Sequence, residues 1–276
     1  MKVRFESSPR EVATMSTAML REQFLVGEIF KEGEINWVYS HYDRVMIGGA
    51  IPLGNSIALQ SFEGLKATYF LERRELGIIN IGGNGSVVVD GQRMDIQKLG
   101  CVYVGRGSKE VVFESVNSED PAVYYLLSAP AHASYPTRHY SKEDAAPATV
   151  GSQETSNLRT IYKYIHQEGL QSCQLVMGLT VLSPGSVWNT MPAHVHDRRM
   201  EAYCYFDVAE GQRVMHLMGE PSETRHIWVE NRQAVISPPW SIHSGCGTSN
   251  YSFIWGMAGE NKDYTDMDMV AIPDLR

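Results

Sequence analysis

The pattern of apolar and polar positions gives one clear helical signal, near the start of the chain. Residues 8–11, Ser-Pro-Arg-Glu, have the spacing of a capping box with proline at the first helical position. Apolar Val12, Met15 and Met19 follow at helical spacing. The pattern therefore predicts one short helix before residue 25.

After residue 25 the pattern changes to short alternating or β-branched runs, separated by Gly, Asn, Asp and Pro. The pair Asp90-Gly91 follows one of these runs directly and is typical of a two-residue hairpin turn. Predicted strands cover residues 36–40, 45–51, 78–81, 86–89, 101–104 and 111–114 in the first half, and 174–182, 201–206, 213–218, 226–229, 234–236 and 251–257 in the second. Because the strands are many, short and regularly spaced, we predict an all-β fold of the sandwich or jelly-roll type.

A segment without clear strand pattern separates the two halves. Residues 129–151 are rich in Pro, Ala and Ser, so we place the inter-domain linker there. The chain has 276 residues, enough for two domains. We assign residues 1–150, with the leading helix and the linker, to the first domain and residues 151–276 to the second. A short repeat supports two copies of one β unit, because residues 73–75 (Arg-Arg-Glu) and 198–201 (Arg-Arg-Met-Glu) each precede an apolar run.

The overall charge argues against a nucleic-acid partner. Lys and Arg number 24 and Asp and Glu number 32, giving a net charge of −8, whereas nucleic-acid binding usually needs a concentrated basic face. The sequence has no apolar run of the roughly eighteen residues that a membrane span needs. The first residues also lack the apolar stretch of a secretory signal. We therefore expect a cytoplasmic protein with neither a nucleic-acid nor a membrane partner.

The cysteines do not form a recognisable framework. Cys101, Cys173, Cys204 and Cys246 are widely spread, with no C-x-x-C pair among them. In a chain of this length without a secretory signal, a disulfide framework or a thiolate zinc site is not expected. We interpret the four residues as small buried apolar side chains in a reducing compartment.

The candidate chemistry lies in two short segments of the second half. His194 and His196 are two residues apart, so in a strand both imidazoles point to one face. Glu201 follows after a short turn, and His243 comes from a Pro-rich segment further on. Three neutral imidazoles and one carboxylate suit zinc, ferrous iron, manganese or nickel, so we predict that these four residues bind a metal ion. The other histidines show no comparable arrangement and are interpreted as non-ligands: His41, His132, His139, His166, His216 and His226.

The same two segments resemble the motifs of the cupin superfamily. Residues 194–201, with their His-x-His and Glu, are similar to the first cupin motif, and residues 238–243, Pro-x-Trp-x-x-His, are similar to the second. Two departures are visible. Trp240 stands where cupins usually have glycine, and Gly185 lies further upstream of the histidines than the usual pattern places it.

Five further segments make the chain similar to one cupin family, the 4-deoxy-L-threo-5-hexosulose-uronate ketol-isomerases, also called 5-keto-4-deoxyuronate isomerases. The segments are residues 69–77 (YFLERRELG), 188–192 (WNTMP), 223–226 (ETRH), 241–245 (SIHSG) and 253–257 (FIWGM). The resemblance extends from about residue 20 to the C-terminus.

The resemblance implies two stacked cupin-type β-barrel (jelly-roll) domains with a few short helices, one zinc ion per chain, and a hexameric assembly. The metal ligands of the family match His194, His196, Glu201 and His243. The N-terminal domain is expected to be a degenerate, metal-free cupin. Glu110 aligns with His243, and no His-x-His precedes Glu75.

The resemblance also implies an intramolecular aldose–ketose isomerase with a small-molecule uronate substrate. Members convert 5-dehydro-4-deoxy-D-glucuronate to 3-deoxy-D-glycero-2,5-hexodiulosonate during the breakdown of pectin or related polyuronides. Four protein ligands leave one or two metal positions open, where a carbonyl and a neighbouring hydroxyl can both bind. Proton removal through an enediolate and a 1,2-hydride shift both remain open as routes.

Three residues are candidates for catalytic roles. If Glu201 points into the barrel, strand alternation directs Tyr203 and Tyr205 inward as well, and Tyr203 could relay a proton or simply fill the barrel. The substrate carboxylate should attract an arginine through paired hydrogen bonds. Arg199 and Arg225 are the candidates, against the alternative that both lie on solvated surface.

Two other functions fit the same metal ligands. An iron-dependent cupin dioxygenase would use them with ferrous iron and oxygen, and a non-catalytic protein would only bind the uronate. Stoichiometric zinc without oxygen uptake favours the isomerase over the dioxygenase. Turnover that is lost when the metal is chelated argues against a protein that only binds.

Overall fold

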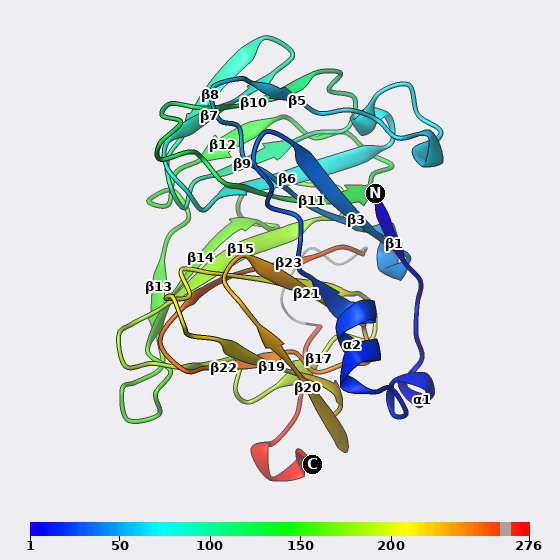
Figure 1. Ribbon diagram of the computed structural model, residues 1–276, viewed down its shortest axis with the longest axis vertical. Helices are drawn as coiled ribbons and strands as arrows, with labels where there is room; N and C mark the ends of the chain where they lie inside the picture. Colours follow the sequence, from blue (N-terminus) through cyan, green and yellow to red (C-terminus); the bar gives the residue numbers. More distant parts are fainter. Residues whose placement is uncertain (260–265) are drawn as a thin grey trace.

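The computed structural model describes residues 1–259 and 266–276. It is built mainly from two pairs of β-sheets, one above the other in Figure 1, with two short helices beside the lower pair. The predicted fold class, two cupin-type jelly-roll units with a few short helices, is confirmed by this arrangement. Within the described residues, no helix is long and apolar enough to cross a membrane.

The first half forms a seven-stranded sheet with the order β1-β3-β4-β11-β6-β9-β12 and a four-stranded sheet with the order β5-β10-β7-β8. Its strands are β1 (Lys2–Arg4), β3 (Ile35–Ser40), β4 (Met46–Ala50), β5 (Ile57–Ala58), β6 (Arg74–Asn80), β7 (Gly85–Val89), β8 (Gln92–Ile96), β9 (Cys101–Val104), β10 (Val111–Ser115), β11 (Tyr124–Pro130) and β12 (Arg138–Tyr140), and its 3-10 helices are η1 (Tyr42–Arg44), η2 (Glu63–Leu65) and η3 (Phe70–Glu72). Asp90 and Gly91, with φ values of 47° and 84°, join β7 to β8. Positive φ at both turn residues is the type I′ geometry, so the predicted hairpin is confirmed.

The second half repeats the two sheets, with the orders β13-β14-β15-β23-β18-β21-β2 and β16-β22-β19-β20, where β2 (Leu25–Val26) comes from the N-terminal segment. Its strands are β13 (Ala148–Val150), β14 (Arg159–Ile165), β15 (Val176–Leu182), β16 (Trp188–Asn189), β17 (His194–Val195), β18 (Glu201–Phe206), β19 (Val214–Glu220), β20 (Glu223–Val229), β21 (Gln233–Ser237), β22 (Ser244–Gly247), β23 (Ser252–Met257) and β24 (Asp268–Met269), followed by η4 (Ile272–Asp274). β17 and β24 pair with each other as a small separate sheet. The C-terminal segment is thereby fixed beside the first two histidines of the predicted metal site.

The N-terminal segment contains two helices, and the prediction of a single helix is wrong. The capping box is present at α1 (Pro9–Val12), where Ser8 accepts from the backbone of Glu11. The chain then turns, and Ser16 caps a second helix, α2 (Thr17–Phe24). Local helical spacing hides the break, because apolar positions continue at the same period on both sides of it.

This N-terminal segment lies against the second half, although the sequence assigns it to the first domain. β2 (Leu25–Val26) pairs with β21 at the edge of the second seven-stranded sheet. Arg225 of β20 donates from Nη1 to the backbone carbonyls of Val12 and Ala13, 3.0 Å each. Such long-range contacts leave no periodic signal, so sequence pattern alone cannot assign the helices to a sheet.

The prediction of no strand between residues 129 and 151 is also wrong. β11 extends to Pro130, β12 closes the first seven-stranded sheet, and β13 opens the second. The chain passes from one pair of sheets to the other between β12 and β13. Strands of three residues at a sheet edge are too short to produce a recognisable alternation.

The strand registers show which positions of the two halves are equivalent. In the first half Leu76 of β6 pairs with Val104, the last residue of β9. In the second half Glu201 of β18 pairs with Ser237, the last residue of β21. Leu76 is therefore the counterpart of Glu201, and the alignment of Glu75 with Glu201 is wrong by one residue. A shift of one position places Glu75 on the opposite face of the sheet.

The two seven-stranded sheets pack against each other through positions without side chains. A Cβ atom at Gly77 would lie 2.6 Å from Sδ of Met177, and one at Gly256 would lie 2.4 Å from Cδ2 of Leu127. These distances are too short for real atoms, since protein interiors are already close-packed. The two glycines therefore allow the sheets of the two halves to approach closely.

Glu75 provides a polar connection across the same contact. Its carboxylate accepts hydrogen bonds from the backbone N–H groups of Cys173, Gln174 and Leu175, at 2.6–2.7 Å. It also accepts from the hydroxyl of Tyr103 at 2.7 Å. A buried carboxylate needs such partners, so Glu75 has a structural role at the junction of the halves.

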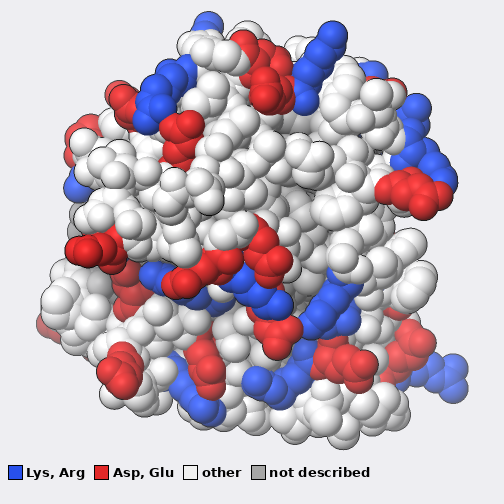
Figure 2. Space-filling model, turned by 45° about the horizontal axis from the view of Figure 1, so that its top comes forward, with Lys and Arg blue, Asp and Glu red and all other residues white. Residues whose placement is uncertain are grey.

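The thiols and the charged surface agree with the sequence analysis in part. Cys101, Cys173 and Cys204 are buried free thiols, as interpreted, whereas Cys246 is half-buried. On the face that Figure 2 shows, acidic and basic side chains are mixed, with no concentrated basic area.

Candidate metal centre

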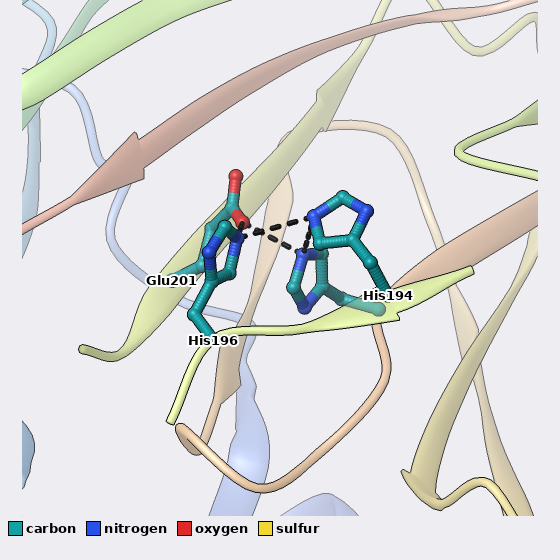
Figure 3. A group of neighbouring side chains, drawn as sticks. His194, His196 and Glu201 are labelled. Carbon is teal, nitrogen blue, oxygen red and sulfur yellow. Dashed lines mark hydrogen bonds and ion pairs between the residues drawn. The ribbon is translucent and has the colours of Figure 1, made fainter. Parts of the chain in front are cut away.

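The four predicted metal ligands meet in the interior of the second half. His194 begins β17 and His196 follows that strand, Glu201 begins β18, and His243 directly precedes β22. All four side chains are buried. Figure 3 shows the rings of His194 and His196 and the carboxylate of Glu201 turned toward one another. The structure therefore brings together the residues that the motif spacing predicts.

The ligand atoms lie at contact distance. Nε2 of His243 is 2.9 Å from Nε2 of His194 and 2.8 Å from Oε2 of Glu201. Nε2 of His196 is 3.1 Å from Nε2 of His194 and 3.1 Å from the same glutamate oxygen. One ligand atom from each of the four residues lies within 4.8 Å of all the others.

Hydrogen bonds alone cannot satisfy all the nitrogen and oxygen atoms of this cluster, because a neutral imidazole has a single N–H group. If His196 and His243 donate from Nε2 to Glu201, neither has an Nε2 proton left for His194. A divalent cation between the four atoms would instead accept a lone pair from each. Ligand atoms about 2.0–2.1 Å from such an ion lie about 2.9–3.4 Å apart, close to the observed separations. The donor set and its spacing therefore fit a metal ion.

Burial and charge set the ionisation of the cluster. Burial lowers the pKa of His194 to about 3, so that its ring is neutral. Burial by itself raises the pKa of the Glu201 carboxyl, but the imidazoles of His243 and His196 outweigh burial and hold this pKa well below its usual range. A neutral imidazole and an ionised carboxylate are the forms that bind metals.

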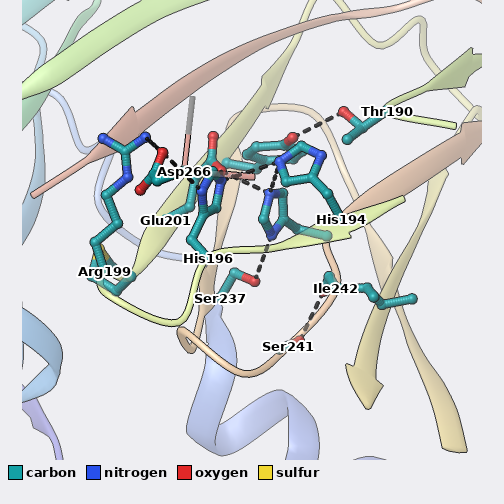
Figure 4. A network of polar contacts seen from close by, with 12 residues as sticks. Thr190, His194, His196, Arg199, Glu201, Ser237, Ser241, Ile242 and Asp266 are labelled. Carbon is teal, nitrogen blue, oxygen red and sulfur yellow. Dashed lines mark hydrogen bonds and ion pairs between the residues drawn. The ribbon is translucent and has the colours of Figure 1, made fainter. Parts of the chain in front are cut away.

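A second carboxylate lies behind the cluster, as Figure 4 shows. Oδ1 of Asp266 is 3.6 Å from Nδ1 of His196 and accepts a hydrogen bond of 2.6 Å from Nη2 of Arg199. Asp266 lies two residues before the start of β24, whose pairing with β17 brings it there. A carboxylate at this distance is too far for a hydrogen bond but places a negative charge beside the ligating imidazole.

A cavity of about 370 Å³ opens beside the ligands. His194, His196 and Glu201 line it together with apolar side chains, among them Phe253, Trp255 and several methionines. This volume is in the range of small-molecule sites. A ligand of the size of a sugar acid can therefore bind next to the four residues.

Tyr203 and Tyr205 both point inward, as strand alternation predicts. Tyr203 lines the cavity, and its hydroxyl is 2.9 Å from Oγ1 of Thr190, which lines it too. Tyr205 lies deeper, with its hydroxyl 2.7 Å from Nδ1 of the buried His216. Burial raises the pKa of Tyr203 well above its usual value, so its phenol is protonated at neutral pH.

Neither candidate arginine lines the cavity. Arg199 is buried and paired with Asp266 behind the metal ligands. Arg225 binds the backbone carbonyls at the end of α1. Their alternative, a solvated surface position, is also wrong for Arg199, which is 1% exposed.

Three further residues of this region were not predicted from the sequence. Thr190 lies within residues 188–192, which indicated only a resemblance to the family. Asp266 reaches the site through a strand pairing between residues about seventy positions apart in the chain. Arg159 lies on β14, which was not predicted, although alternate residues of that strand, Arg159, Ile161 and Lys163, line the cavity.

Known proteins resemble this chain over nearly its whole length. The model of the KduI/IolB family matches residues 24–272. A 4-deoxy-L-threo-5-hexosulose-uronate ketol-isomerase of Halalkalibacterium halodurans is 55% identical, with all of both chains covered. One of Formosa agariphila is 54% identical over 99% of this chain and 98% of that protein.

Solved structures share the fold at low identity. An IolB-like protein of Salmonella typhimurium has a TM-score of 0.72 and 17% identity, covering 90% of this chain and 96% of that one. Bacillus subtilis oxalate decarboxylase, described with Mn(II) centres, has a TM-score of 0.56 and 9% identity, covering 82% of this chain and 71% of that one. With the family model matched over nearly its whole length, the chain belongs to the KduI/IolB family.

Proposed function

We propose that the chain is a ketol-isomerase that converts 5-dehydro-4-deoxy-D-glucuronate to 3-deoxy-D-glycero-2,5-hexodiulosonate in polyuronide degradation. We also propose that His194, His196, Glu201 and His243 hold one zinc ion per chain. The names of relatives that are 55% and 54% identical support the activity. The observation that carries the proposal is the convergence of four ligand atoms beside a cavity of suitable size.

The reaction exchanges a carbonyl and a hydroxyl between the first two carbons of the sugar acid. A divalent ion in the cluster would supply Lewis-acid polarisation of these two oxygens. Because its phenol stays protonated, Tyr203 is suited to donate a hydrogen bond to a substrate oxygen and to pass on a proton. Thr190 orients that phenol through the contact between their hydroxyls.

We further propose that residues 1–150 are a metal-free domain and residues 151–276 the metal-binding domain, and that the protein assembles as a cytoplasmic hexamer. The apolar interior of the first half supports a structural role for it. Met1, Val3 and Phe5 on and beside the edge strand β1 are 41–67% exposed. Apolar side chains in such a row support contact with another subunit.

The test combines metal analysis with turnover of the deoxy-keto uronate. We expect about one zinc per chain, isomerisation without oxygen uptake, and loss of activity on chelation that zinc restores. Iron with oxygen uptake would instead establish the dioxygenase. Full metal content with no turnover would favour a protein that only binds uronates.

A further inference from the structure

The end of the cavity away from the metal ligands is formed by one face of β14. Arg159, Ile161 and Lys163 occupy alternate positions of this strand, and all three line the cavity. Among the described residues of the lining, Arg159 and Lys163 are the only Lys or Arg, and Glu201 is the only Asp or Glu. The cavity therefore has a cationic end and a metal-ligand end.

Arg159 is a partly buried cation with an incomplete set of partners. Its side chain donates one hydrogen bond, from Nη1 to the carbonyl of Asn157 at 2.8 Å. No carboxylate of the described residues lies within ion-pair distance of it. Burial lowers the pKa of its guanidinium. A guanidinium has five N–H groups in a planar fork, so an anion can complete this site.

Between the two ends, the described lining residues include no other cationic side chain that could bind a carboxylate. Phe253, Trp255 and Met257 line the cavity from β23, which lies between β14 and β18 in the sheet order. The indole N–H of Trp255 is already donated to Thr180 at 3.2 Å. Arg199 and Arg225, the other candidates, are bonded elsewhere. A carboxylate bound in this cavity is therefore best placed at Arg159.

The separation of the two ends suits a six-carbon chain. In the sheet order, β14 is three strands from β18, which carries Glu201, or about 14 Å at about 4.8 Å per strand. An arginine side chain and a six-carbon sugar acid each span roughly 6–7 Å from bond lengths of about 1.5 Å. Together they bridge the distance from the backbone of β14 to that of β18, which carries Glu201.

The chemistry of the proposed substrate makes such an anchor necessary. Its aldehyde and hydroxyl, which react, lie at one end, whereas its carboxylate and the adjacent ketone lie at the other. Both ends present two neighbouring oxygens that could bind a divalent ion. Holding the carboxylate away from the histidines leaves the reacting end for the metal ligands.

We propose that Arg159 binds the carboxylate of the substrate at the end of the cavity opposite His194, His196 and Glu201, and thereby selects uronates in the productive orientation. This inference rests on the proposed function for the identity of the substrate. Lys163 adds positive charge to the same face of β14 but is more exposed. Arg159 supplies the planar fork that pairs with a carboxylate through two hydrogen bonds.

The test compares Arg159→Gln, Arg159→Lys and the control Arg213→Gln in the zinc-loaded protein. Arg213 is an exposed arginine of the same half, paired with Glu230. In Arg159→Gln we expect KM for the deoxy-keto uronate to rise by about 10–100-fold, the usual range for a lost charged hydrogen bond. Zinc content should be unchanged. Arg159→Lys should recover part of the loss, and Arg213→Gln should match the unaltered protein.

A binding measurement gives a readout that does not depend on turnover. We expect the unaltered protein to bind D-glucuronate about 10–100-fold more tightly than the uncharged D-glucuronamide by calorimetry. Arg159→Gln should bind both equally. An unchanged KM, or an unchanged preference for glucuronate, overturns the proposal. If Arg159→Gln loses zinc, the same comparison in Arg159→Lys decides, with a reduced preference supporting the proposal and an unchanged one overturning it.

The same data separate this inference from the proposed function. Failure of the unaltered protein to isomerise the deoxy-keto uronate would refute the proposed function alone. A preference for glucuronate that depends on Arg159 would then still establish the carboxylate site.

Discussion

Leu76 and Glu201 occupy equivalent positions in the two halves of the chain, yet their surroundings are opposite in character. Leu76 packs with Trp37 and Phe113 in an apolar cluster, whereas Glu201 contacts the imidazoles of His196 and His243. The next inward positions differ in the same way, with Ile78 opposite Val102 in the first half and Tyr203 opposite Val235 in the second. The same strand positions can therefore carry either a packed core or a polar site, so the fold alone does not determine function.

A second pair of equivalent residues shows how the site is supported. Arg74 and Arg199 each stand two residues before Leu76 and Glu201. Arg74 donates to Ser128, from Nε to the hydroxyl at 3.0 Å and from Nη2 to the carbonyl at 2.8 Å. Arg199 instead holds Asp266 against His196. The buried arginine therefore bonds to a neighbouring strand in the first half, whereas in the second half it positions a carboxylate beside the metal ligands.

The largest effect that this comparison predicts is the contrast between His243→Ala and Glu110→Ala. His243 contacts two other ligands, so its loss should reduce metal content and activity by more than about 100-fold, beyond the usual loss for an outer partner of a ligand. Glu110 is exposed directly before β10, and its removal should change neither metal content nor activity. Elemental analysis and turnover measure both, and circular dichroism checks the fold. Retained metal in His243→Ala, or lost metal in Glu110→Ala, would contradict the comparison.

Replacing the apolar side chain of Leu76 with a carboxylate should destabilise the first half. Leu76→Glu would bury a carboxylate without partners, which should lower the free energy of unfolding by about 3–5 kcal/mol. Leu76→Met keeps the volume and the apolar surface, so its effect should stay under about 1.5 kcal/mol. Urea denaturation of both variants measures the difference. Equal stabilities would show that the interior around Leu76 tolerates charge.

Removing the charge behind His196 should weaken metal binding without abolishing it. Asp266→Asn keeps the shape but loses the carboxylate, and metal affinity should fall by about 10–100-fold. Asp268→Asn, two residues further in β24 and exposed, is the matched control. Competition with a chelator of known affinity measures both. An unchanged metal affinity in Asp266→Asn would show that Asp266 does not support metal binding.

Buried histidine should make the second half sensitive to acid. Burial lowers the pKa of His216 to about 3, whereas an unfolded histidine has a pKa of about 6.5. Between these values the unfolded chain binds a proton that the folded chain does not, so stability falls as the pH decreases from about 6.5 toward 3. Between pH 7 and pH 5, the free energy of unfolding of His216→Gln should fall by about 2 kcal/mol less than that of the unaltered protein. Urea denaturation at the two pH values tests this, and parallel losses would count against a neutral His216.

Signals that are local in sequence predicted structure well. The type I′ turn at Asp90-Gly91 and the capping box at Ser8 each depend on neighbouring residues, and both are present. His194 and His196 point to one site because alternation fixes their common face. His243 was added as a third imidazole from a Pro-rich segment, and that segment is also similar to a cupin motif.

Contacts that depend on pairing between strands distant in the sequence could not be predicted in the same way. Asp266 reaches His196 only because β24 pairs with β17. Arg159 alternates with Ile161 on a strand whose polar face lines a cavity, which looks from sequence like an ordinary solvated face. Glu75 appeared to match Glu201 because strand register cannot be fixed to one residue from a short repeat.

The most direct test of the account is an anomalous-difference map at the zinc absorption edge from crystals of the purified protein. We expect one strong peak per chain in contact with Nε2 of His194, His196 and His243 and with Oε2 of Glu201, and no peak beside Leu76. A map without density at these four residues, or with its peak in the first half, would contradict the central claim.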